Sequence, residues 1–418
     1  MGPVSRYRRL WLPELIVLIV VAVLGTLAFW LTDLDITAAR PFHHPTSADP
    51  WPIDNQPLWR FSYRSAPWVT GSLALAGAVA LVAGAVRVNS RRFRLHGLFL
   101  LLSVAVGPGL IVNGILKDHW GRPRPRQIVE LGGRLEYAPP LLPVGDHGKS
   151  FPCGHCSVGY LYSAGWWLWR RRHPVYAHAS LAVGLVLGTL LGIGRMAAGG
   201  HFLSDVLWSG LIAFGVAHAL YFYVLRIPAR EDSRASVFPA IERSPRLRAA
   251  AILGASLLGA SVVAGGMLAS AHYQDLSRTV ALADFPVRPR TLDVEVSVLD
   301  VELEIVDAPP VAISSGGYVH GFGLPTNRIT AEWWCDNAPA PVLHYRLRAR
   351  GWFTDIDGVA RLAIPAVAFD RIAVRVERGD IVVTDRRAPR AAGMPPSPVL
   401  DLQTADGRIL APTSAIVP

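Results

Sequence analysis

The chain has 418 residues, of which 51% are hydrophobic and 17% charged, and its formal net charge is +10. Soluble domains carry about 25% charged residues, so this composition argues against a soluble chain and favours a membrane protein. The positive charge has a second explanation, a nucleic-acid-binding patch, which the positions of the arginines can test.

Long apolar runs dominate residues 1–270. A helix needs about 20 apolar residues to cross about 30 Å of hydrocarbon. In chain order the predicted spans are Leu15–Leu31, Val69–Val86, Leu98–Leu116, Val158–Trp169 with its upstream turn, Val175–Ile193 and Leu203–Leu225. A seventh run, Ala249–Ser270, is rich in Gly and Ala but uncharged, and we expect it to span as well. The first run contains Pro13 and Glu14 and lacks a clean cleavage site, which favours a retained anchor over a secretory signal.

Arginines cluster at the ends of particular spans. The four clusters, before the first span and after the second, fourth and sixth, are Arg6, Arg8 and Arg9; Arg87, Arg91, Arg92 and Arg94; Arg170, Arg171 and Arg172; and Arg226, Arg230, Arg234, Arg243, Arg246 and Arg248. All four lie on one side if the amino terminus is cytoplasmic, as the positive-inside rule requires. The charge therefore indicates topology rather than nucleic-acid binding. With seven spans, residues after about Ala271 are expected outside the cytoplasm.

The last part of the chain shows the two-residue alternation of strands. The alternating runs are Leu292–Val298, Val301–Ile305 and Ile372–Val376. We interpret Arg378-Gly379-Asp380 as a turn between strands rather than as an adhesion signal, and Asp406-Gly407 predicts a hairpin turn. The Pro- and Ala-rich residues 387–398 predict a loose connection.

The expected fold is an all-α polytopic membrane helix bundle, with a six-span core and a seventh span, followed by a C-terminal extracytoplasmic all-β domain. The expected parts are an anchor span and outer loop (1–66), a core bundle (67–225), a basic cytoplasmic loop with the seventh span (226–270) and the β-rich domain (271–418).

The third span ends in a cationic stretch, Lys117-Asp118-His119-Trp120-Gly121-Arg122-Pro123-Arg124-Pro125-Arg126. The predicted topology places this stretch outside, against the positive-inside trend. Its Gly and Pro residues prevent a continuous helix, so the chain can turn and direct Lys117 and Arg124 to one spot as a clamp for a dianion. Contact with lipid headgroups is the alternative use of these cations.

The start of the fourth span carries a second candidate motif on the same side. Backbone N–H groups at a helix start are unpaired and lie at the positive end of the helix dipole, so Cys153, Gly154 and His155 can surround an anion. His155 is then placed beside that anion. A solvated histidine is the alternative.

The loop between the fifth and sixth spans carries the third motif. His201 and Asp205 are four residues apart and share a helix face, so the carboxylate can hold one ring nitrogen while the other faces a substrate. Arg195 adds a cation, and Gly199-Gly200 allows close approach of the backbone. A His–Asp pair that merely joins two helices is the alternative, but three loops bring these residues to one membrane face.

These spacings resemble the three signatures of the type 2 phosphatidic acid phosphatase superfamily. The matching residues are Lys117 with Arg124-Pro125, Pro152 with Gly154-His155, and Arg195 with His201 and Asp205. The resemblance covers about residues 67–225 and implies a phosphoryl transfer on six membrane helices without metal or cofactor. It also implies that His201 attacks phosphorus, Asp205 orients it and His155 protonates the leaving oxygen. The implied phosphate ligands are Lys117, Arg124, Arg195 and the Gly154 amide.

Cys153 departs from the family pattern, which has serine at this position, and a thiol is the weaker donor to phosphate. Together with Cys156 it forms Cys-Gly-His-Cys, a pattern typical of redox dithiols. A membrane thiol–disulfide oxidoreductase and a phosphatase-like scaffold without catalysis are therefore the alternatives. Metal binding by His119, His155 and His201 is disfavoured because the nearby cations would repel a metal.

A site at a membrane interface suits a lipid phosphate or pyrophosphate. The candidates are lipid A, a polyprenyl pyrophosphate, phosphatidylglycerol phosphate and phosphatidate, in a bacterial inner membrane with the site on the periplasmic side. The sequence does not choose among these lipids, or between hydrolysis and transfer to another lipid. It predicts no nucleic-acid partner and identifies no partner for the β-rich tail.

Overall fold

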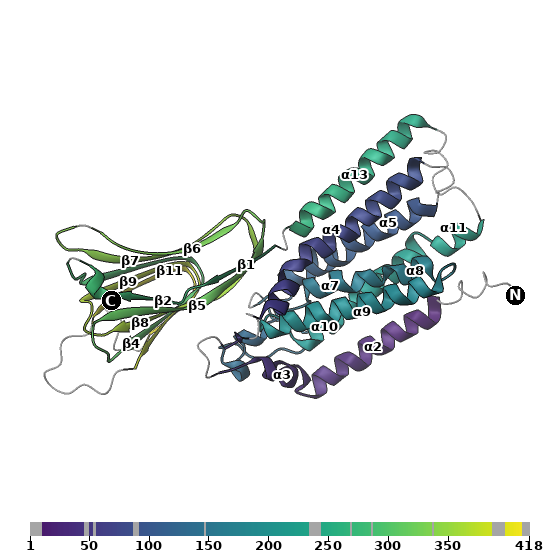
Figure 1. The fold of residues 1–418 in the computed structure, drawn as a ribbon. Helices are drawn as coiled ribbons and strands as arrows, with labels where there is room; N and C mark the ends of the chain where they lie inside the picture. The colour runs from purple at the N-terminus through teal and green to yellow at the C-terminus, as the bar shows by residue number, and fades with distance from the viewer. Residues whose placement is uncertain are drawn as a thin grey trace. The chain divides into compact units, whose positions relative to one another are not determined.

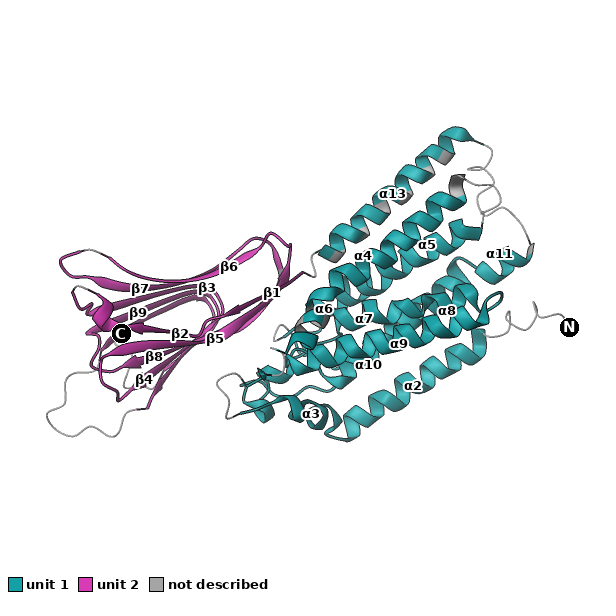
Figure 2. Cartoon of the chain, viewed as in Figure 1, with its two compact units in different colours: residues 1–267 teal, residues 268–418 magenta. Residues whose placement is uncertain are grey.

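The computed structural model describes residues 11–45, 50–52, 56–86, 92–145, 148–233, 244–267, 270–285, 287–336, 338–386 and 398–411. The chain divides into two compact units, Met1–Met267 and Leu268–Pro418 (Figure 2). The first unit consists of helices and the second of strands (Figure 1). The predicted combination of a helix bundle and a C-terminal β-rich region is confirmed.

In the described part of the first unit, two long helices change their hydrogen-bonding pattern along their length. The α-helices are α2 (Trp11–Leu31), α3 (Leu34–Ala39), α4 (Pro57–Val86), α5 (Arg92–Val104), α7 (Gly154–Tyr160), α8 (Ala164–Trp169), α9 (Pro174–Ala197), α10 (Leu203–Ala219), α11 (Ile227–Ser233) and α13 (Pro245–Met267). α5 continues through the π-helix η4 (Ala105–Leu116) into α6 (Lys117–His119), and α10 continues as η8 (Leu220–Val224). Pro108 lies in η4, and its missing N–H accounts for a local departure from α-helical pairing.

Six helices in the described ranges are long and apolar enough to cross a membrane: Trp11–Leu31, Pro57–Gly84, Arg92–His119, Pro174–Ala197, Leu203–Val224 and Pro245–Gly265. They cover six of the seven predicted spans. The other, Val158–Trp169, lies in α7, the 3-10 turn η7 (Leu161–Ser163) and α8, which together form a shorter helical segment over residues 154–169. The number of crossings and the side of each loop therefore stay predictions.

Close packing of α7 against α9 fixes two parts of the candidate site. A Cβ on Gly159 of α7 would lie 2.7 Å from the Gly188 Cα of α9, so both helices need glycine at this contact. Since α7 begins just after Cys153 and α9 carries Arg195, this contact fixes the second and third motifs relative to each other.

The second unit contains two sheets. Its strands are β1 (Ser270–Asp275), β2 (Arg278–Ala281), β3 (Thr291–Val298), β4 (Asp300–Val306), β5 (Ala312–Gly323), β6 (Arg328–Cys335), β7 (Val342–Arg350), β8 (Phe353–Pro365), β9 (Arg371–Arg378), β10 (Ile381–Asp385), β11 (Val399–Asp406) and β12 (Ile409–Leu410). One sheet has the order β1-β5-β8-β4-β10-β12, with β2 also paired to β5, and the other has β11-β9-β3-β7-β6.

Several consecutive strands of the second unit lie in different sheets, and within each sheet the corresponding strands pair in parallel. β3, β7, β9 and β11 lie in one sheet, and each is followed by a strand of the other sheet, β4, β8, β10 and β12. The register places Leu292 opposite both Leu343 and Ile372, and all three side chains are buried. The three alternating runs are therefore strands β3, β4 and β9, with their apolar residues in the core.

The predicted hairpin at Asp406-Gly407 is wrong, because β11 pairs with β9 whereas β12 pairs with β10. This turn passes from one sheet to the other, and so does the turn at Arg378-Gly379-Asp380. The two turns stack: Gly379 N–H donates to the Asp406 carbonyl (2.8 Å), and the Asp380 carboxylate accepts from Arg408 N–H (2.8 Å). These contacts support the turn interpretation of Arg-Gly-Asp. Of the predicted loose connection, residues 387–397 lie outside the described residues.

Candidate active site

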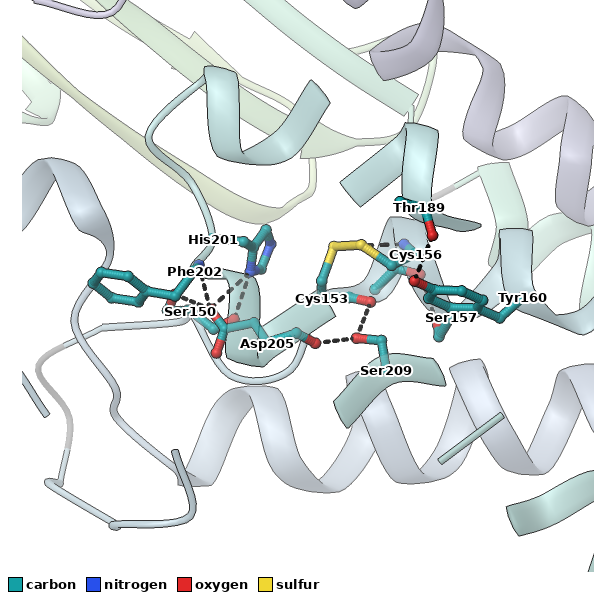
Figure 3. Close-up of a disulfide and its surroundings, with 11 residues drawn as sticks. Ser150, Cys153, Cys156, Ser157, Tyr160, Thr189, His201, Phe202, Asp205 and Ser209 are labelled. Atoms are coloured by element: carbon teal, nitrogen blue, oxygen red, sulfur yellow. Dashed lines mark hydrogen bonds and ion pairs between the residues drawn. A yellow bond between two sulfur atoms is a disulfide. The ribbon is translucent and has the colours of Figure 1, made fainter. Parts of the chain in front are cut away.

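His201 lies in the short connection between α9 and α10 and is 2% exposed. Its Nδ1 is 2.5 Å from the Ser150 carbonyl oxygen (Figure 3). A carbonyl oxygen can only accept, so Nδ1 carries the ring proton and Nε2 keeps its lone pair. The ring therefore has a nucleophilic nitrogen on the side away from this hydrogen bond.

Asp205 is fully buried in the first turn of α10 and accepts from three groups. Oδ2 accepts from the Ser150 hydroxyl (2.6 Å) and the Phe202 amide (2.8 Å), and Oδ1 accepts from Arg122 (2.5 Å). Oδ2 is 3.6 Å from His201 Nδ1, which is too long for a hydrogen bond but within range of a charge interaction. The predicted His–Asp pair is present as an ion-pair contact, whereas Ser150 supplies the hydrogen bond that orients the ring.

The surroundings keep His201 neutral. Burial is the main cause that lowers the pKa of His201 from 6.5 to about 4; the positive charges of Arg195 and Lys117 act in the same direction, and Asp205 opposes them. At neutral pH the imidazole is therefore uncharged, with its single ring proton on Nδ1, although cations lie nearby. A nucleophile that attacks an anion requires this combination.

Arg195 and Lys117 reach the surroundings of His201 from different helices. Arg195 lies in the last turn of α9 and is 2% exposed. Its Nη2 is 2.5 Å from the place that a Cβ on Gly200 would occupy, so the guanidinium group lies against the backbone just before His201. Lys117 is half-buried at the start of α6.

The cationic loop that carries Arg124 is joined to the histidine loop through the backbone. Arg124 is 3% exposed, and the N–H of Arg126 donates to the Gly199 carbonyl (3.2 Å). Gly199 has φ +61°, and a Cβ there would lie 2.6 Å from the Trp51 ring, so a side chain does not fit at this position. The turn before His201 is thus held between Trp51 and the cationic loop.

The start of α7 differs from the predicted phosphate cradle. Cys153 is the N-cap and forms a disulfide with Cys156, whose amide also donates to the Cys153 sulfur (3.4 Å). The Cys153 amide donates to the Asp205 carbonyl (3.5 Å), and a disulfide sulfur has no proton to give to phosphate. Gly154 and His155 form the first turn of α7, with His155 buried. The predicted thiol contact therefore requires the reduced protein.

Two charged residues of the site were missed from the sequence. Arg122 and Asp35 are both fully buried and form an ion pair (2.8 Å), and Arg122 also contacts Asp205. Arg122 stands two residues before Arg124 in a loop already recognised as cationic, but no local pattern separates the two roles. Asp35 is 87 residues from Arg122 in the chain, so no spacing rule connects them.

The described residues contain no group of three or more His, Cys, Asp or Glu side chains arranged to hold a metal ion. In the described ranges, His201 is therefore influenced by the cations Arg195 and Lys117 but lies in no recognisable metal centre. This donor set suits an anionic substrate.

Comparison with known proteins identifies relatives of this part of the chain. A lipid A 4'-phosphatase of Francisella tularensis subsp. novicida (strain U112) is 35% identical over 137 residues, which are 32% of this chain and 61% of the relative. Proteins of the same name from Rhizobium leguminosarum and Rhizobium etli are 33% and 36% identical over 124 and 126 residues, each 28% of this chain. The matches cover 52% and 47% of those two relatives, so the chain spans about half of their length.

The model of the PAP2 superfamily matches residues 96–229. This range contains all three motifs and runs from within α5 to within α11. The resemblance seen in the motif spacings is confirmed by this match over residues 96–229.

Proposed function

We propose that this protein is a membrane phosphatase that removes phosphate from a lipid phosphate through a phosphohistidine at His201. The observation that carries the proposal is a buried, neutral histidine whose Nδ1 donates to a main-chain carbonyl and whose Nε2 is left to attack, near Arg195 and Lys117. The similarity to lipid A 4'-phosphatases supports the same activity.

The transfer takes two steps. In the first, Nε2 of His201 forms a bond to phosphorus as the bond from phosphorus to the lipid oxygen breaks, and His155 gives a proton to that oxygen. In the second, His155 takes a proton from water, the water oxygen bonds to phosphorus, and the P–N bond breaks to release inorganic phosphate. Lys117, Arg124 and Arg195 bind the non-bridging oxygens, whose negative charge must be held throughout.

The names of the relatives make a phosphorylated glycolipid such as lipid A the first substrate to test. The bacterial relatives suggest a bacterial inner membrane, and the arginine clusters at the span ends favour a cytoplasmic amino terminus, so we expect the site and the β-rich unit on the periplasmic side. Other lipid monophosphates and lipid pyrophosphates carry the same terminal phosphate group and belong in the same assay.

A thiol–disulfide oxidoreductase is disfavoured by burial. Cys153 and Cys156 are each 0% exposed, whereas exchange requires an attacking thiolate to reach a sulfur atom. That activity also leaves the His201 and Arg195 arrangement without a role.

The test is phosphate release by the purified full chain in detergent, with chelator present, from lipid A, phosphatidate, phosphatidylglycerol phosphate and a polyprenyl pyrophosphate. We expect release from at least one lipid, and His201→Ala to lower it by at least about 10³-fold. His119→Ala is the matched control, because this exposed histidine lies in the same cationic stretch. An acid quench during turnover should trap an acid-labile phosphoenzyme in the unmodified protein. Near-normal release by His201→Ala would refute the assignment of the nucleophile.

A further inference from the structure

The guanidinium group of Arg122 donates hydrogen bonds to several buried acceptors that lie far from it in the sequence. Its Nε donates to the Ala138 carbonyl (2.8 Å) and its Nη1 to the Ser204 hydroxyl (2.8 Å). Nη1 also donates to Asp205 (2.5 Å), and Nη2 donates to Asp35 (2.8 Å). Arg122 is 0% exposed, so its charge is directed to these groups rather than to a substrate.

Asp35 fixes the beginning of the helix that carries Asp205. Its Oδ1 accepts from the Ser204 amide (2.8 Å), and its Oδ2 accepts from the Ser204 hydroxyl (2.6 Å) and from Tyr137 (3.0 Å). Ser204 lies in the first turn of α10, where amides lack helix partners and a negative charge is favourable. Asp35 therefore holds the residue next to Asp205 through two hydrogen bonds.

The network has one guanidinium group between two carboxylates. Burial disfavours the charged form of Arg122, but Asp205 and Asp35 outweigh burial and raise the pKa of Arg122 above its usual value. Burying such a network carries a large desolvation cost, and an apolar replacement is often at least as stable. Its geometry, ending on the carboxylate beside His201, indicates a use other than stability.

We propose that Asp35 and Arg122 are positioning residues that set the place and the effective charge of Asp205 beside His201. This inference rests on the proposed function, because it concerns the nucleophile of that reaction. The positive charge of Arg122 acts on both Asp35 and Asp205. Arg122 therefore compensates part of the negative charge of Asp205 that acts on the imidazole of His201, and Asp35 determines how large that part is.

The two residues should change His201 in opposite directions. The groups that face His201 are Asp205 from α10, Arg195 from α9, Lys117 from α6 and the Ser150 carbonyl before α7. Without Arg122, the charge of Asp205 is uncompensated and His201 binds its proton up to a higher pH. Without the charge of Asp35, Arg122 neutralises Asp205 more completely and His201 binds its proton only at a lower pH.

The experiment compares Asp35→Asn, Arg122→Gln and Arg122→Lys in the full chain. We expect Asp35→Asn to lower kcat by on the order of 10²-fold with KM unchanged, because the phosphate-binding cations are untouched while the nucleophile is misplaced. The acid limb of kcat/KM should move to higher pH in Arg122→Gln and to lower pH in Asp35→Asn. Arg122→Lys keeps the positive charge, so the acid limb of its kcat/KM profile should lie close to that of the unmodified protein.

Asp232→Asn is the matched control, since it makes the same chemical change in a half-buried pair with Arg171, between α11 and the segment after α8. It should lower Tm but leave kcat and the acid limb unchanged, which is the result of a purely structural role. The inference is overturned if Asp35→Asn behaves like this control, or if both network variants move the limb in the same direction. If Arg122→Gln does not fold, Asp35→Asn and Arg122→Lys carry the same test.

A second readout separates this inference from the proposed function. NMR of the protein labelled with ¹⁵N-histidine follows the titration of His201 without turnover, with His201→Asn identifying the signal. Opposite shifts in the two network variants support the positioning role even if no lipid releases phosphate, in which case only the phosphatase proposal fails. Unchanged titration in both variants overturns the positioning role whatever the activity.

Discussion

The depressed pKa of His201 predicts a measurable loss of stability in acid. The ordinary pKa of histidine is 6.5, and that of His201 in the folded protein is about 4. As pH falls below 6.5 the unfolded chain binds a proton that the folded protein does not, so stability is lost until the pH passes the folded value. At pH 4.5 the loss from this one residue is roughly 2.5 kcal/mol, since each unit of pKa difference is worth about 1.4 kcal/mol.

His201→Asn removes this loss while its side-chain amide can still donate to the Ser150 carbonyl. Thermal unfolding of the full chain in detergent at pH 7 and pH 4.5 measures the effect. We expect Tm to fall by about 5–10 °C less in His201→Asn than in the unmodified protein, because about 1 kcal/mol corresponds to about 2–4 °C for a unit of this size. His119→Asn, a change at an exposed histidine, should not reduce the fall. An equal fall in His201→Asn and the unmodified protein would refute the neutral, buried histidine.

Three further predictions follow from the site and the arginine pattern. Ser150→Ala keeps the carbonyl that orients His201 but removes the hydroxyl bond to Asp205, so kcat should fall roughly 10–100-fold and Tm by several degrees, as kinetics and thermal unfolding of the purified variant would show. Cys153→Ser should retain or raise phosphate release, because a hydroxyl is a good donor to an anionic oxygen and a disulfide sulfur is none; complete loss would favour the dithiol alternative. Reporters fused after Asp205 or at Pro418 should report the periplasm and one at Arg172 the cytoplasm; a cytoplasmic result at Pro418 alone would remove the seventh span but spare the site.

The sequence was most informative where chemistry follows a short spacing. His201 lies just before the helix whose first turn carries Asp205, rather than on the same helix face as predicted, but the spacing of four residues still brings the two side chains together. The spacing did not predict the Ser150 carbonyl as the partner of Nδ1. Every residue has a main-chain carbonyl, and only the folded path of the chain brings that of Ser150 next to His201. Asp35 was missed for a related reason: its partners come from distant loops.

In the second unit, the two-residue alternation of apolar side chains predicted which segments are strands and which of their faces are buried. It did not predict which strands pair with each other. Leu400 and Ile409 lie close together in the chain, yet Leu400 belongs to the sheet of β9 and Ile409 to the sheet of β10. A tight turn with glycine is compatible with a hairpin and with a passage between sheets, because both need a sharp change of direction. The pairing of each strand with its neighbours in the sheet, rather than the residues of the turn, decides between a hairpin and a passage between sheets.

The charge balance of the site favours one kind of phosphate group. Arg122 is engaged by Asp35 and Asp205, and these three residues together carry one net negative charge. The proposed phosphate ligands Lys117, Arg124 and Arg195 are all cationic. A phosphate monoester dianion carries twice the charge of a diester monoanion, so these cations should attract it more strongly. A phosphate monoester of a lipid should therefore react in preference to the matching methyl diester, and equal turnover of the two would show that this charge balance does not select the substrate.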